Sequence, residues 1–261
     1  MGARAPAVLA VPAGVAVAFL LLPLAGLLAR APWAGLPRLL SEPAVRDALR
    51  LSLLTASLAT GVCVLLGVPL AWLLARASFP GRALLRALVT LPLVLPPVVG
   101  GVALLLAFGR RGVVGRHLAG LFTLPFTTAG VVLAETFVAM PFLVVAVEGA
   151  LGSVDRRYEE AAATLGAGRW TAFRRVTLPL VAPSVGAGAV LCWARALGEF
   201  GATITFAGNL PGVTQTMPIA VYVALETDPE AAVALSLVLL AVAIMVLVGL
   251  RERWLPAAAG P

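Results

Sequence analysis

The sequence predicts an all-α membrane protein in which six transmembrane helices form one domain over residues 1–261. Hydrophobic residues make up 61% of the chain and charged residues only 12%, whereas soluble domains carry roughly 25% charged residues. Six apolar segments reach the roughly 20 residues that a helix needs to cross a bilayer. They span about 7–29, 49–75, 84–108, 129–151, 181–206 and 231–250. A soluble core could not bury this much apolar surface, so the excess is expected to face lipid or other helices within lipid.

The first apolar segment follows a basic start at Arg4, and Ala29-Arg30-Ala31 after it resembles a signal-peptide cleavage site. Its apolar run is longer than the roughly 7 to 15 residues of a signal-peptide core, which favours an uncleaved transmembrane helix. Cleavage stays open as the alternative. The chain is therefore expected to be a multi-pass protein of the cell (inner) membrane, with the lipid bilayer as its surroundings.

The distribution of arginine sets the expected orientation. The chain has 19 basic residues, and every one is arginine. With the N-terminus placed inside, eleven arginines fall on the inner side and seven on the outer side, which predicts that both termini are cytoplasmic. Membrane orientation explains these basic segments, and no nucleic-acid partner is predicted.

The third apolar segment contains Pro92, Pro96 and Pro97. Each proline removes a backbone donor and blocks a helical hydrogen bond, so this helix is expected to bend or break. Freed carbonyls within a bilayer are tolerated against protein or a water-filled cavity, which predicts a place near the middle of the bundle, at the transport pathway or dimer seam, for Pro96 and Pro97. A proline kink with only a packing role is the alternative.

The loop after the third apolar segment and the two cysteines have modest predicted roles. The outer loop from Phe108 to His117 is basic and rich in glycine, which is typical of a solvated loop, although it would also suit an anionic ligand or a partner. Cys63 and Cys192 fall inside apolar runs and are interpreted as small buried residues. His117 is the only histidine and cannot form a metal site alone, so no metal or other cofactor is predicted to bind this chain.

A polar segment rich in arginine, about 153–179, separates the fourth and fifth apolar segments. Ser153 or Asp155 can cap a helix, and acidic residues in the first turns, Glu159 and Glu160, suit the positive end of its dipole. Alanines continue the helix to Gly166, a good C-terminal stop residue. A second short helix is expected from Arg169 to Val176.

The predicted result is a helix, a glycine turn and a helix exposed on the cytoplasmic face. Small side chains at Ala161 and Ala162, together with Leu165, would form a flat apolar patch. Small residues allow close approach by a partner, and the surrounding arginines can pair with acidic groups. An amphipathic loop that packs on its own bundle is the alternative.

The spacing within this segment resembles a known signature. The segment is similar to the cytoplasmic signature of permease subunits of binding-protein-dependent ABC importers, with Val176 where isoleucine is usual. The matching residues, in order, are Glu160-Ala161-Ala162, then after three residues Gly166, after nine more Val176, and after one more Leu178-Pro179. The resemblance implies a type I permease fold with a coupling helix seated on a separate ATPase subunit. The implied coupling residues are Glu159, Glu160, Ala161, Ala162, Leu165, Gly166, Leu178 and Pro179. The chain has no phosphate-binding Gly-x-x-x-x-Gly-Lys motif, so ATP and magnesium are expected on the partner, and this chain is not expected to be an enzyme.

The fifth apolar segment carries charges. Arg195 and Glu199 are spaced as an i, i+4 pair, and Thr203 extends the same predicted helical face. Charges in a bilayer cost about 2.5 to 3.5 kcal/mol on insertion scales, so they are expected to pair and face the bundle interior. On one interpretation, this face lines the transport pathway or the dimer seam. The alternative is that the pair only stabilises the helical bundle and does not contact the transported ion.

The run from Ala194 to Pro218, the proline-rich third segment and the loop at Phe108 resemble permeases of the molybdate/sulfate importer group. The resemblance implies molybdate as the substrate, a homodimer, two cytoplasmic ABC ATPase subunits and an extracytoplasmic molybdate-binding protein. Tungstate, sulfate or thiosulfate are alternative substrates.

Two other classes of protein fit less well. An ion-driven secondary transporter would leave the signature unexplained, and no inverted repeat with matching broken helices is apparent. A membrane enzyme would need convergent polar groups that the sequence does not offer. Glu135 and Glu148 lie on different faces of the fourth span, which argues against a paired-carboxylate site.

Overall fold

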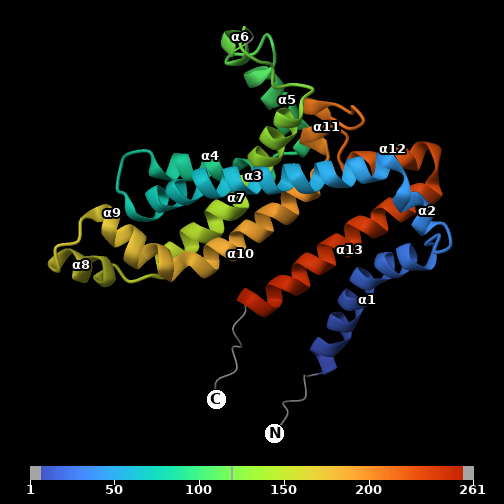
Figure 1. The fold of residues 1–261 in the computed structure, drawn as a ribbon. Helices are drawn as coiled ribbons and strands as arrows, with labels where there is room; N and C mark the ends of the chain where they lie inside the picture. The colour runs from blue at the N-terminus through green and yellow to red at the C-terminus, as the bar shows by residue number, and fades with distance from the viewer. Residues whose placement is uncertain (1–6, 119, 255–261) are drawn as a thin grey trace.

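The computed structural model describes residues 7–118 and 120–254, so Arg4 lies outside the described residues. Within these ranges the chain is helical and contains no strand, which confirms the predicted all-α class (Figure 1). The helices are α1 (Ala7–Ala29), α2 (Leu36–Ser41), α3 (Pro43–Arg76), α4 (Arg82–Val94), α5 (Pro97–Phe108), α6 (Gly115–Leu118), α7 (Thr128–Ser153), α8 (Arg157–Thr164), α9 (Arg169–Ala172), α10 (Leu178–Leu197), α11 (Gly201–Ala207), α12 (Met217–Thr227) and α13 (Pro229–Trp254), with a π-helical turn at Phe173–Thr177.

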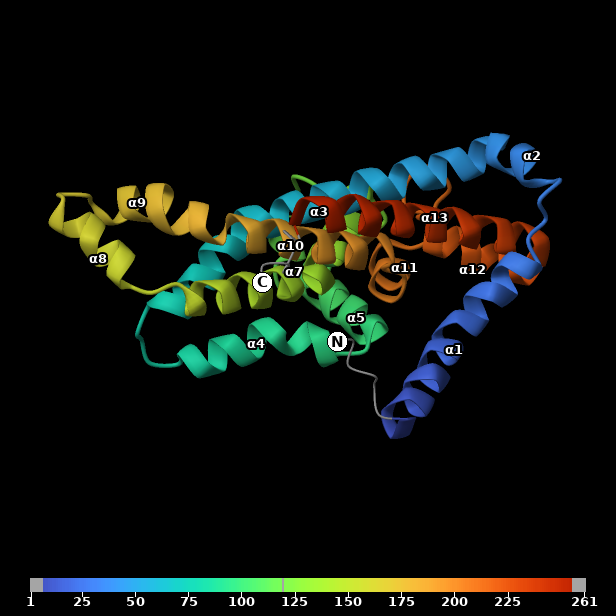
Figure 2. The same cartoon turned by 90° about the horizontal axis from the view of Figure 1, so that it is seen from below.

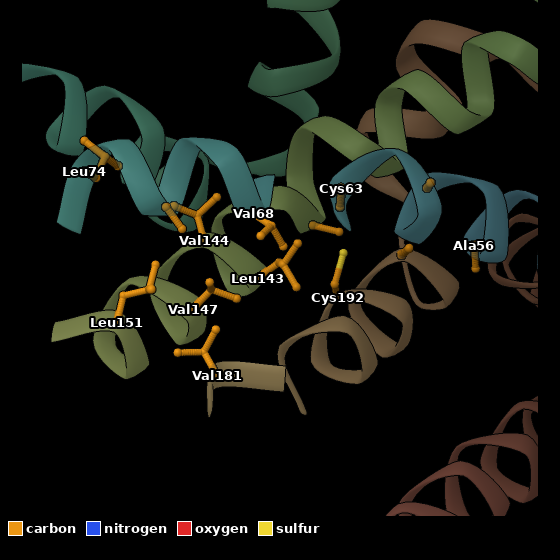
Figure 3. Close-up of a cluster of buried hydrophobic side chains, with 14 of the residues drawn as sticks. Ala56, Cys63, Val68, Leu74, Leu143, Val144, Val147, Leu151, Val181 and Cys192 are labelled. Atoms are coloured by element: carbon orange, nitrogen blue, oxygen red, sulfur yellow. The ribbon is translucent and has the colours of Figure 1, made fainter. Parts of the chain in front are cut away.

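The centre of the molecule is a bundle of α3, α7 and α10, which pack along most of their lengths. Figure 3 shows side chains of all three helices meeting in its interior, among them Leu143 and Val147. Glycines allow the close approach: a Cβ at Gly188 would lie 3.1 Å from the Cβ of Ala146. Cys63 and Cys192 are buried and free within this bundle, as predicted.

The third predicted span is broken, as its prolines indicated. Helix α4 ends at Val94, α5 begins at Pro97, and α5 leaves α4 at a steep angle (Figure 1). One face of α5 packs tightly on α11, where a Cβ at Gly101 would lie 2.6 Å from Thr205 Cβ. Pro96 and Pro97 are themselves exposed in the single chain, and α4 has no buried residue. The single chain therefore does not place Pro96 and Pro97 in the middle of the bundle, although α5 packs on α11 through Gly101.

The structure corrects the fifth predicted span, which is not one continuous helix. Helix α10 ends at Leu197, and α11 begins at Gly201. Phe200, between them, has φ −124° and ψ −56°, outside the regular helical range. The break resets the helical phase, so Thr203 does not continue the face that carries Arg195.

Within the part of the chain that the structure describes, five helical segments are long and apolar enough to cross a membrane, namely 9–29, 43–76, 128–153, 169–197 and 229–246. The remaining predicted span corresponds to the broken pair α4 and α5. Helix α12 is apolar but too short to span and was not predicted as a helix. Helix α1 meets little of the bundle, and none of its span is buried within the chain.

Candidate coupling surface and buried charge pair

Helix α8 and helix α9 project together from one end of the α3–α7–α10 bundle (Figures 1 and 2). The start of α8 is held by Asp155, whose Oδ1 accepts a hydrogen bond from the Arg157 backbone N–H at 3.0 Å. Ser153 instead donates its hydroxyl to the Ala150 carbonyl, so of the two predicted candidates only Asp155 bonds the first residue of α8. Glu159 and Glu160 follow in the first turn, where the helix dipole favours negative charge.

The turn after α8 is a Schellman motif centred on Gly166. Its backbone N–H donates to the Ala163 carbonyl, and the next N–H, of Ala167, donates to the Ala162 carbonyl, both at 3.0 Å. Gly166 has φ +82°, a left-handed conformation that glycine adopts without steric cost. The sequence prediction of a glycine stop at this position is confirmed.

The outward face of α8 and the turn after it is open and partly apolar. We call Glu160, Ala161, Leu165 and Gly166 the coupling face; all four are exposed, and Leu165 has 88% of its surface accessible. Ala162 is half-buried beside it. An exposed apolar patch at the tip of a protruding helix is typical of a surface for protein contact.

Leu178 and Pro179 lie away from the coupling face. Leu178 packs against the core of the α3–α7–α10 bundle, and Pro179 occupies the first turn of α10. The structure thus brings together Glu160, Ala161, Leu165 and Gly166 of the predicted coupling residues, while Leu178 and Pro179 connect the projecting segment to the bundle.

Glu159 faces the opposite way from its neighbour Glu160. Its Oε1 accepts a hydrogen bond from the Thr177 hydroxyl at 2.8 Å and lies 3.4 Å from Arg76 Nε. Arg76, with only 8% of its side chain exposed, also donates from Nη2 to the Val154 carbonyl at 3.0 Å. Glu159 therefore ties α8 to the end of α3 and to the π-helical turn before α10. Sequence analysis missed Arg76 and Thr177 because only the fold brings them next to Glu159.

We expect the two adjacent glutamates to respond differently to neutralisation. Glu159→Gln weakens a partly buried, charge-assisted contact and should destabilise the permease by about 1 to 3 kcal/mol. Glu160→Gln alters an exposed side chain and should change stability by less than about 0.5 kcal/mol. Thermal unfolding of both purified variants in detergent checks this, and equal unfolding temperatures for the two would contradict the inward assignment of Glu159.

The charges predicted within the fifth span do form a pair. Arg195 Nη2 lies 2.5 Å from Glu199 Oε2, and the Glu199 side chain is 1% exposed. The other carboxylate oxygen, Oε1, accepts the backbone N–H of Ala202 at 2.8 Å, in the first turn of α11. Glu199 therefore joins the end of α10 to the start of α11. Thr203 is fully buried one turn further along.

The two glutamates of α7 have separate partners. Glu135 is buried and accepts the Thr55 hydroxyl of α3 at 2.9 Å. Glu148 pairs with Arg86 of α4, whose Nε lies 2.8 Å from Glu148 Oε1. Both contacts hold α7 to neighbouring helices. No group of three or more His, Cys, Asp or Glu side chains suited to a metal ion occurs among the described residues.

A family model described as "binding-protein-dependent transport system inner membrane component" matches residues 67–255. The chain belongs to this family. The match includes the coupling face and the Arg195–Glu199 pair, so both lie within the region that defines this inner membrane component. The family comprises membrane subunits of transport systems, which agrees with the multi-pass helical structure.

Relatives of this inner membrane component cover nearly its whole length. The Molybdenum transport system permease protein ModB of Mycobacterium tuberculosis is 51% identical over 245 residues, which are 93% of this chain and 92% of the relative. ModB of Escherichia coli K12 is 46% identical over 80% of this chain and 92% of its own length. The Sulfate transport system permease protein CysT of the same organism is 40% identical over 87% of this chain and 84% of its own.

Solved structures of the same fold include an alginate ABC transporter in complex with a periplasmic protein that carries an alginate pentasaccharide. One chain of it matches 94% of this chain, and 92% of its own, with a TM-score of 0.77 and 18% identity. The MetNI methionine ABC transporter in inward-facing conformations matches 81% of this chain and 96% of its own, with a TM-score of 0.63 and 20% identity. The chain thus has the fold of an ABC importer permease.

Proposed function

We propose that this chain is the permease subunit of a binding-protein-dependent ABC importer that takes up molybdate. The observation that carries the proposal is the 51% identity, over 93% of the chain, to a permease named for molybdenum transport. The substrate then crosses the membrane along a path formed by the α-helical bundle. The sequence contains no phosphate-binding Gly-x-x-x-x-Gly-Lys motif, which supports placing ATP with magnesium on a partner subunit.

The proposed assembly contains two copies of this chain, two cytoplasmic ABC ATPase subunits and an extracytoplasmic molybdate-binding protein. The exposed coupling face supports the ATPase contact, because Leu165 and Ala161 are left exposed by the described residues. The exposed apolar side chains of α4 and α5, including Leu91, Val94, Val98 and Val102, support a further helical contact such as a second copy would supply.

The proposed orientation places both termini in the cytoplasm. Arg76, Arg82 and Arg86 lie at the same end of the bundle as the arginines of α8 and α9, and a concentration of arginine favours the cytoplasmic side. The C-terminal end of α1 and the N-terminal end of α13 meet at the opposite end, beside α2 and α12 (Figure 1). Each of these two helices then runs back toward the side that carries α8.

The contacts of α8 suggest how ATP hydrolysis on a partner moves the bundle. A partner that displaces the coupling face would carry Glu159 with it, and Glu159 holds Arg76 of α3 and Thr177 beside α10. Because α3, α7 and α10 pack as one unit, displacement of α8 would reach the central bundle directly. ATP binding then turns the path outward, and hydrolysis with product release returns it to the inward-facing state.

Sulfate or thiosulfate is the second candidate substrate, because a sulfate permease is 40% identical over 87% of the chain. Tungstate is a third, since it is chemically close to molybdate. All four are tetrahedral oxyanions, so discrimination among them would depend largely on the external binding protein.

Uptake of labelled molybdate tests the proposal, in cells that lack their own importer and express this permease with its neighbouring ATPase and binding protein. We expect uptake that requires all three proteins and resists a large excess of sulfate. Uptake abolished by sulfate would assign the chain to the sulfate group. Uptake by the permease alone, driven by an ion gradient, would overturn the importer proposal and favour a secondary transporter.

A further inference from the structure

A cationic cavity lies between the end of α3 and the α8–α9 segment, beside the coupling face. Its volume is about 450 Å³, and its charged lining residues are Arg76, Arg156, Arg169 and Glu159. Three guanidinium groups against one carboxylate give the lining two net positive charges. Arg76 and Glu159 already pair with one another, and among the described residues Arg156 and Arg169 make no ion pair. The cavity therefore offers two uncommitted cations to an anion.

A second, apolar groove adjoins this cavity. Its volume is about 260 Å³, and it is lined by Pro69, Trp72, Arg169, Trp170 and Phe173. Trp72, Arg169 and Phe173 line both spaces, so cavity and groove share one wall. The phenyl ring of Phe173 stacks on Trp170 at 5.6 Å and meets Trp72 edge-on at 6.2 Å. Trp170 stays 69% exposed although it is a large aromatic side chain.

The combined shape matches an amphipathic ligand. Trp72 lies near the end of a transmembrane helix, and tryptophan is typical of the level at which lipid headgroups meet hydrocarbon. Basic pockets at that level of membrane proteins bind phosphate-bearing lipid headgroups. A soluble anion would use the cationic cavity but would leave the aromatic groove empty, whereas a phospholipid would fill both.

We propose that the cavity at Arg156 and Arg169 binds the phosphate headgroup of an anionic phospholipid, whose acyl chain lies along the groove at Trp72, Trp170 and Phe173. The site adjoins Glu159 and α8, so a bound lipid would stabilise the position from which the coupling face meets its partner. This lipid site does not depend on which oxyanion the importer carries.

Native mass spectrometry of the delipidated permease–ATPase complex tests the site, with phosphatidylglycerol and phosphatidylcholine of the same chain length added separately. We expect preferential retention of phosphatidylglycerol, and a loss of about tenfold in its affinity in the variant Arg156→Gln/Arg169→Gln. The matched control is Arg110→Gln/Arg111→Gln, which removes two exposed arginines from the loop after α5 and should leave retention unchanged. Trp170→Gln should weaken phosphatidylglycerol binding while keeping both arginines.

Three results would overturn the proposal. They are equal retention of the two lipids, an equal loss in the control variant, and displacement of phosphatidylglycerol by inorganic phosphate at the same concentration. The last result would assign the cavity to a soluble oxyanion. Lipid retention is measured without transport. The lipid proposal can therefore fail while molybdate uptake succeeds, and lipid retention can succeed while molybdate uptake fails.

Discussion

Replacing Gly166 with arginine is expected to abolish substrate uptake while the permease still accumulates in the membrane. The left-handed conformation at φ +82° would cost an arginine about 1 to 2 kcal/mol, which strains the turn without unfolding the bundle. A Cβ at this position would meet no atom of the described residues within 4 Å, so the arginine can project from the coupling face. Uptake should fall by more than about tenfold, and co-purification of the ATPase should fall with it, since about 1.4 kcal/mol of lost binding already means a tenfold weaker complex.

The loop offers its own control for this variant. Gly168 lies two residues further on and has φ −66°, and a Cβ added there would also meet no atom within 4 Å. Gly168→Ala should therefore be tolerated, whereas Gly166→Ala should lower uptake through backbone strain alone. Unchanged uptake in the Gly166→Arg variant would remove the assignment of this surface as the ATPase contact.

Local sequence rules predicted the features that depend on local backbone chemistry. The third span is broken at Pro96 and Pro97, neither of which can donate a helical hydrogen bond, whereas Pro92 lies inside α4 without breaking it. Gly166 ended α8 because a left-handed residue closes a Schellman turn. Both the fold class and the exposed helix before Gly166 could therefore be predicted without knowledge of the tertiary structure.

Contacts between distant segments could not be predicted in this way. The spacing of Arg195 and Glu199 correctly indicated a pair, but it also suggested a continuous helix. In the structure Glu199 lies just before α11 and accepts the Ala202 N–H, and no propensity rule distinguishes such a residue from one within a helix. Glu159 likewise looked equivalent to Glu160, and only the position of Arg76 at the end of α3 separates their roles.

Arg195→Leu is expected to cause the largest loss of stability among these variants. It would leave Glu199, which is 1% exposed, as an uncompensated buried charge, and breaking a buried pair in this way costs about 3 to 5 kcal/mol. Glu199→Gln should cost less, because the amide oxygen can still accept the Ala202 N–H and the Arg195 side chain is 27% exposed. Thermal unfolding of the purified permease should show this asymmetry, and Arg195→Leu/Glu199→Gln should recover much of the loss because no buried charge remains.

The same variants separate the two roles considered for this pair. If the pair only stabilises the junction of α10 and α11, the double variant should regain both stability and uptake, since the fold no longer carries an unpaired charge. A pathway role predicts regained stability with uptake still absent, because the guanidinium itself would contact the oxyanion. The geometry favours the stabilising role. Arg195 lies 2.5 Å from the Glu199 carboxylate, which would repel an anion and which is itself bonded to the first turn of α11. We therefore expect uptake to follow stability across the series, measured as transport per folded permease in the membrane.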